Sequence, residues 1–341
     1  MLSVIRNLVL FVVTFVAVSA GLRPSYTTDK TLRAKVDYFR QHKDEFDFVF
    51  FGSSRIYRCF DSKHFDRQVS ATGMPMKSYN FAFQYHRPHE MNQLIAAVLA
   101  SKPKRLKTIA VELMNWNPTI LAAMRTHDRT PAWHTLAESI SACQTIWRAK
   151  EPFEKKIQWW TIHASNCVAR WINHGGGTRW IEQHFDDPKE HTRLLAKMER
   201  GNGFVALDAE TEEVYAMRFR RFREFFWDIF YKQVLMIPQK NREQGTLRHF
   251  NLSAQLAQQT MIQQSGVRAL FVIPTVRQGT PVMNQLADHL DHFFSYNHPL
   301  RWPHLYRRDR YWDRRHMNQL GAKEFSEVFA AEFVRRQRDS R

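Results

Sequence analysis

Three residues that lie far apart in the chain could together activate an alcohol. Ser54 follows the apolar run Phe46–Phe51, whereas Asp313 and His316 are three residues apart near the other end. On one helical turn or in a tight loop, residues at that spacing face the same side. A carboxylate there can orient an imidazole, whose other ring nitrogen takes the proton of a serine. These residue types therefore predict acyl transfer through a serine nucleophile.

The same residues also have simpler interpretations. Gly52-Ser53-Ser54 after a strand is often a turn that ends in a helix N-cap. Asp313 and His316 could form a surface pair in the basic Tyr306–His316 loop, and Asp309 is an alternative orienting acid. We favour the catalytic interpretation because the serine and its two partners occur together.

Two short motifs resemble the SGNH/GDSL hydrolase superfamily. Gly52-Ser53-Ser54 is similar to the first block, with Ser53 in place of the usual aspartate, as in exported members that act in alginate O-acetylation and D-alanyl transfer. Asp313-Arg-Arg-His316 resembles the last block, Asp-x-x-His. The resemblance implies Ser54 as nucleophile, His316 as general base and Asp313 as orienting acid, with no cofactor and no metal.

The resemblance also implies donors for an oxyanion hole, although these blocks match less well. The backbone N–H of Ser54 is one expected donor. The second is the N–H of Ala82, in Tyr79-Asn-Phe-Ala82, where the family has glycine. The third is the side chain of Asn115, or alternatively that of Asn117. One missing oxyanion donor can lower the rate about 10²–10³-fold. These differences from the family's motifs therefore also allow the alternative of a catalytically inactive protein.

The elements that must position these residues alternate between strands and helices. Strands are expected at 46–51, 77–81, 107–113 and 267–274, and helices at 88–100, 252–264, 282–293 and 321–335. This alternation predicts an α/β fold with a mostly parallel sheet. The resemblance implies a three-layer, SGNH or flavodoxin-like α/β/α arrangement. We assign the core to 46–118 plus 246–341.

Residues 119–245 have a different character and predict a mostly helical insertion. Within it, Arg218–Tyr231 carries phenylalanines at helical spacing, with arginines between them. Such a stripe can lie in a membrane interface, but more often it faces a core. We expect this segment to pack on the sheet or to cover the active site.

The start of the chain resembles an export signal. Arg6 precedes a largely apolar stretch over residues 8–20, and small residues around Ala20 form an acceptable cleavage site. We predict a signal peptide or an uncleaved inner-membrane anchor over 1–20, and then a linker with a lead-in helix over 21–45. Cys143 and Cys167 could pair in an oxidising compartment, although separate thiols are slightly favoured.

The charge of the chain bears on its partners. The 341 residues carry a formal net charge of +17, without zinc-finger spacing or an RNA-binding aromatic motif. We expect an exported, periplasmic or cell-envelope protein that acts on an ester or acyl donor, with a glycan as the substrate implied by the resemblance. The alternatives are an inactive envelope protein that binds an anionic glycan or an assembly partner, and a charge-driven membrane or nucleic-acid binder.

Overall fold

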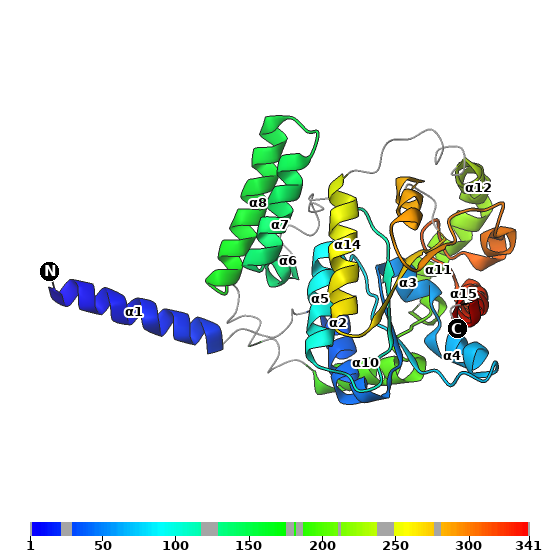
Figure 1. Cartoon of the computed structure of the whole chain (residues 1–341), viewed down its shortest axis with the longest axis horizontal. Helices are drawn as coiled ribbons and strands as arrows, with labels where there is room; N and C mark the ends of the chain where they lie inside the picture. The colour runs from blue at the N-terminus through cyan, green and yellow to red at the C-terminus, as the bar shows by residue number, and fades with distance from the viewer. Residues whose placement is uncertain are drawn as a thin grey trace. The chain divides into compact units, whose positions relative to one another are not determined.

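The computed structural model describes residues 2–21, 29–116, 129–174, 181, 187–210, 213–236, 249–275 and 281–339. The chain forms two compact units (Figure 1). The helical unit comprises Met1–Ala34 and Asn117–Leu194, and the sheet unit comprises Lys35–Trp116 and Leu195–Arg341. Each unit is described separately below.

The sheet unit contains a five-stranded parallel sheet with the strand order β2-β1-β3-β4-β5. Its strands are β1 (Phe48–Phe51), β2 (Ser78–Asn80), β3 (Thr108–Glu112), β4 (Arg268–Ile273) and β5 (Phe293–Ser295). The predicted α/β class is confirmed, and the four expected strands are present. The fifth strand, β5, was not predicted. The expected helix over 282–293 is instead the 3-10 helix η5 (Pro281–Asp288).

Helices cover both faces of the sheet, which gives three layers (Figure 1). On one face, α3 (Ser54–Cys59) and α4 (Ser62–Ser70) pack against α15 (Gln319–Asp339). On the other face, α5 (Pro88–Ala100) packs against α14 (His249–Gln264), which also contacts β4. In the described part of the chain there are also the short 3-10 helices η1 (Lys43–Glu45), η3 (Leu207–Glu210), η6 (Pro303–Tyr306) and η7 (Arg308–Arg310).

Phenylalanines form much of the core on the α15 side of the sheet. Phe48 and Phe50 are two residues apart on β1, so their rings project to the same face. Both rings contact Phe60 and Phe329, at centroid distances of 4.9–6.1 Å. Every residue of β1 is buried, as expected for a strand covered on both faces. This packing explains why α15, at the far end of the chain, docks on the first strand.

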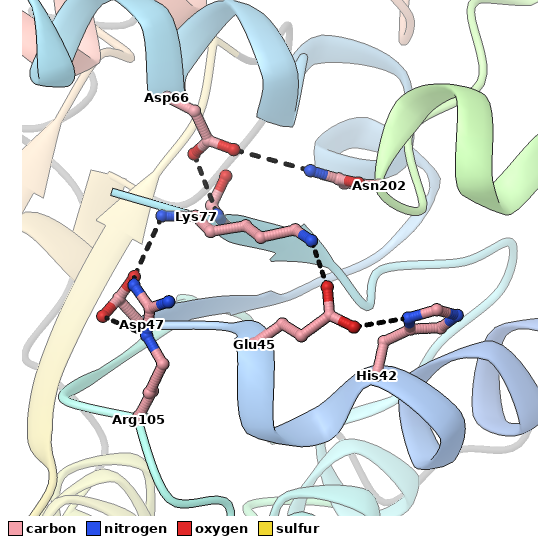
Figure 2. A network of polar contacts seen from close by, with 8 residues as sticks. His42, Glu45, Asp47, Asp66, Lys77, Arg105 and Asn202 are labelled. Carbon is pink, nitrogen blue, oxygen red and sulfur yellow. Dashed lines mark hydrogen bonds and ion pairs between the residues drawn. The ribbon is translucent and has the colours of Figure 1, made fainter. Parts of the chain in front are cut away.

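A polar network joins the starts of three neighbouring strands (Figure 2). The buried Asp47 carboxylate accepts hydrogen bonds from the backbone N–H of Lys77 at 3.1 Å and from Arg105 Nη2 at 2.7 Å. Its backbone carbonyl accepts the N–H groups of Lys107 and Thr108. Asp47 therefore helps to set the register of β1, β2 and β3 at the amino edge of the sheet.

Asp66 in the same network predicts a pH-dependent stability. It accepts the backbone N–H of Ser78 at 2.9 Å (Figure 2), yet burial raises its pKa from 3.8 to about 7. Because the pKa of Asp66 is raised in the folded state, its protonated carboxyl stabilises the fold. This stabilisation is fully present below pH 3.8 and is lost as the pH rises through about 7. We expect the unfolding temperature to fall less between pH 5 and pH 8 in Asp66→Asn than in the wild type. Thermal melts by circular dichroism test this, and parallel pH curves for both proteins would contradict it.

The helical unit contains α1 (Leu2–Gly21), α6 (Arg129–Trp133), α7 (Leu136–Arg148), α8 (Phe153–Trp171) and the start of α10 (Pro188–Gly201). Helix α1 is long and apolar enough to cross a membrane, and a signal sequence has the same properties. It covers the predicted residues 8–20 and extends beyond them. Cys143, Cys167 and the buried Cys59 are all free thiols.

The predicted insertion over 119–245 is divided differently in the structure. Its first part groups with the helical unit, whereas the described residues from 195 to 236 belong to the sheet unit. This second part includes α11 (Glu213–Arg221), a π-helix (Phe222–Phe226) and α12 (Trp227–Leu235). This second part groups with the sheet unit because its aromatic side chains pack on the loop that carries His316, as described below.

Candidate active site

The carboxyl ends of β1 and β3 lie where the strand order reverses. The chain passes from β1 to β2 on one side and then returns to β3 on the other. In open parallel sheets, ligands bind outside the strand ends at such a switch point. Here Gly52, Ser53 and Ser54 follow β1, and Glu112 is the last residue of β3.

The turn after β1 is held closely by its neighbours. The Gly52 carbonyl accepts hydrogen bonds from the backbone N–H of Phe83 at 3.2 Å and from His86 Nδ1 at 2.9 Å. A Cβ atom on Gly52 would lie 2.6 Å from Cγ1 of Ile56 and 2.9 Å from Oε2 of Glu112. Only glycine fits at this position without movement of the turn or of its neighbours.

Ser53 and Ser54 have different tasks at the start of α3. The Ser53 side chain caps the helix by accepting the backbone N–H of Arg55 at 3.3 Å, so the N-cap interpretation holds for Ser53. Ser54 is the first residue of α3. Its backbone N–H has no hydrogen-bond acceptor among the residues that the structure describes. The positive end of the helix dipole lies at the same point.

Asp313 organises the loop that carries His316. Its Oδ1 atom accepts the backbone N–H groups of Arg315 at 2.7 Å and of His316 at 3.0 Å. An antiparallel bridge between Tyr311 and Met317 closes the loop. The loop therefore places the carboxylate and the imidazole side by side, as their spacing predicts.

A continuous chain of hydrogen bonds joins Ser54, His316 and Asp313, which are here called the triad. His316 Nε2 lies 2.9 Å from Ser54 Oγ. His316 Nδ1 lies 3.0 Å from Oδ1 of Asp313 and 3.2 Å from Oδ2. Since a carboxylate only accepts, Nδ1 carries the proton and Nε2 is left to accept from the serine hydroxyl. The alternative acid, Asp309, is instead paired with Arg307 and Arg310.

Neither Ala82 nor Asn115 is positioned by a hydrogen bond to the triad in the described part of the chain. The prediction for Ala82 is wrong, because its backbone N–H donates to Oδ1 of Asn80 at 3.0 Å in a buried turn. A side-chain acceptor two residues earlier takes that N–H, which a sequence motif does not reveal. Asn115 is exposed, and no hydrogen bond links it to the triad in the described part of the chain. Asn117 lies outside the described residues.

Glu112 is a site residue that the sequence analysis missed. Its side chain is fully buried, and its Oε2 accepts the backbone N–H of Ser53 at 2.5 Å. Its Oε1 pairs with Nη2 of Arg55 at 2.6 Å. One carboxylate thus holds both residues that flank Ser54. The available signal was a single acidic residue within the largely apolar run of the predicted strand at 107–113.

Replacing Glu112 with glutamine is expected to slow the reaction of Ser54. Glutamine keeps an oxygen for the Ser53 N–H but loses the charge that pairs with Arg55. A misplacement of about 1 Å can lower a rate about 10²-fold, so we expect the labelling of Ser54 by a fluorophosphonate to slow by roughly 10–100-fold. Glu327→Gln, which alters an exposed pair with His64, is the matched control. An unchanged labelling rate in Glu112→Gln would contradict the positioning role.

Aromatic residues of α11 and α12 pack on the loop that carries Asp313 and His316. Phe219 stacks on Trp312 at a centroid distance of 4.5 Å. Trp227 and Phe230 contact Tyr311 at 5.8 Å and 5.2 Å. The aromatic segment 218–231 therefore supports the residues directly before Asp313, and its buried members Phe222, Trp227 and Phe230 face protein.

The comparisons with known proteins do not assign the chain to a family. No family model matches the chain, and no curated protein is significantly similar to it. The functional argument therefore depends on the geometry of the site.

Proposed function

We propose that the protein is a serine ester hydrolase or O-acyltransferase that works through an acyl-enzyme on Ser54. The observation that carries this proposal is the unbroken hydrogen-bond chain from Ser54 through His316 to Asp313. A serine at the carboxyl edge of a parallel sheet, on the first turn of a helix, is also well placed to meet a substrate.

The reaction would follow from the groups present. Ser54 Oγ attacks the acyl carbonyl while His316 Nε2 takes the hydroxyl proton, and Asp313 stabilises the resulting imidazolium. The Ser54 N–H and the amino end of α3 favour the developing oxyanion. The leaving alcohol then takes the proton from His316, and Ser54 holds the acyl group. Water as the second nucleophile gives hydrolysis, whereas a sugar hydroxyl gives acyl transfer.

The substrate and location are inferred from other features. The apolar helix α1 is compatible with export, either as a signal peptide or as an anchor in the inner membrane. The net charge of +17 favours an anionic partner. Together with the resemblance to exported acyl-transfer proteins, these features favour modification of a cell-envelope or secreted polysaccharide in the periplasm.

A serine-reactive fluorophosphonate probe tests the proposal. The intact protein should be labelled, and Ser54→Ala should remove the label. Ser265→Ala, on a turn remote in sequence from the triad residues, is the control and should label normally. Labelling that survives in Ser54→Ala would place the reactive serine elsewhere and contradict the assignment.

A second candidate is an envelope protein that keeps this fold without catalysis and binds an anionic glycan or an assembly partner. The observation that favours it is the engagement of the Ala82 N–H by Asn80, which removes one expected oxyanion donor. A folded, intact protein that fails to react with the probe would support this candidate over the enzyme.

A further inference from the structure

Helix α8 exposes an apolar stripe along one side. Its members are 46–66% exposed and are spaced three, four or eight residues apart, which places them on one helical face: Phe153, Ile157, Trp160, Val168 and Trp171. Between them on the same face is Ala164. The buried residues His163 and Asn166 lie on the other side of the helix. Large apolar side chains gathered in this way mark a surface that normally meets another apolar phase.

Helix α7 repeats the pattern beside α8 (Figure 1). Leu136, Ile140 and Trp147 are 49–71% exposed and follow one another at intervals of four and seven residues. The residues that α7 buries, among them Ala142 and Ile146, lie on a different side of the helix. Among the residues that the structure describes, two adjoining helices thus each leave an apolar face uncovered.

The position of α1 indicates what covers these faces. Just after α8, Asn173 Nδ2 donates a hydrogen bond to the backbone carbonyl of Ser19, near the end of α1. Residues 2–18 of α1 are exposed, and the helix projects away from α8 (Figure 1). A bilayer that contains α1 would therefore begin next to the last turn of α8, where Trp171 is 65% exposed. Tryptophan is enriched at that depth of a membrane.

The charges around the stripes agree with a lipid surface. Residues 136–174 contain five lysines and arginines against three glutamates. Arg148, Lys150 and Lys155 are exposed around the connection between α7 and α8. Helices with basic polar sides and tryptophan, phenylalanine or leucine on the apolar side typically lie in the interface of a membrane with anionic lipids.

We propose that the exposed apolar faces of α7 and α8, here called the α7–α8 surface, lie in the interfacial layer of a lipid bilayer beside α1. The surface is independent of the proposed chemistry at Ser54. It would give the protein a second membrane contact besides α1, in the same structural unit.

Spin labels on the full-length chain test this proposal. The protein, with Cys143 and Cys167 replaced by serine, is reconstituted in vesicles of phosphatidylethanolamine and phosphatidylglycerol. One variant carries the nitroxide at Ile157→Cys, on the stripe, and the matched control carries it at Gln158→Cys, which is exposed on another side of the same helix. Collision rates with oxygen, which concentrates in lipid, are compared with those of a water-soluble nickel chelate.

The two positions should give opposite results. In vesicles, the label at 157 should have an oxygen-to-nickel collision ratio several-fold higher than the label at 158. Equal ratios at both positions would overturn the proposal. A second outcome would also overturn it: shielding of the label at 157 from both reagents, in vesicles and in detergent alike, together with spin–spin broadening. In that case a second copy of the chain would cover the surface. Circular dichroism confirms that both variants are folded.

Discussion

Replacing His316 with alanine is expected to make Ser54 almost unreactive. Its Nε2 atom lies 2.9 Å from the serine oxygen and is the base in the proposed mechanism. Without a base, a serine hydroxyl is a weak nucleophile, and loss of the base lowers turnover about 10⁶-fold in a serine protease. We expect the fluorophosphonate labelling rate to fall by at least about 10⁴-fold.

A histidine outside the site provides the control for this variant. His64 pairs with the exposed Glu327, so His64→Ala should label at the wild-type rate. Partial recovery of labelling in His316→Ala on addition of free imidazole would further assign the loss to the missing base. A His316→Ala protein that is labelled as fast as the wild type would show that the serine is activated by another group.

The second large effect is expected for Asp313→Asn. Asparagine can still accept the backbone N–H groups of Arg315 and His316, so the loop should keep its shape. It carries no charge to stabilise the imidazolium, and its amide favours the wrong tautomer of the ring. In serine proteases the equivalent change lowers the rate about 10⁴-fold, and we expect a loss of this order in the labelling rate with little change in the melting temperature.

Asp309→Asn distinguishes the two candidate acids. Its carboxylate pairs with Arg307 and Arg310 and not with His316, so this variant should remain within about twofold of the wild-type rate. If Asp309→Asn were the slower variant of the two, the assignment of Asp313 as the orienting acid would be wrong.

The sequence predicts most of the sheet because the strands are buried on both faces. Phe46–Phe51 and Val267–Pro274 are short, largely apolar runs, and within them every residue of β1 and every residue of β4 except Arg268 is buried. The pairing of Asp313 with His316 is also predictable, because a local spacing determines it. Strand β5 is only three residues long and lies next to a stretch with helical spacing, so no periodic signal identifies it.

The remaining parts of the site depend on tertiary contacts. Nothing local to Glu112 indicates that its carboxylate will meet the turn after a different strand. The engagement of the Ala82 N–H likewise depends on how the Asn80 side chain settles, with its amide donating to the carbonyls of Ile56 and Phe60. The resemblance to a short motif predicted the Ala82 N–H as an oxyanion donor, but in the folded turn this N–H donates to Asn80 Oδ1.

Because the chain is made from its amino end, Ser54 is synthesised long before His316. The two residues are 262 positions apart in the chain, and the acid and base both lie on the C-terminal loop before α15. Under the proposed mechanism, a chain that emerges from its amino end carries an unreactive serine until the C-terminal loop has been made and has docked on the sheet. Fragments truncated before residue 313 would not react with the fluorophosphonate. Labelling of Ser54 would therefore report only molecules that contain the C-terminal loop and are folded.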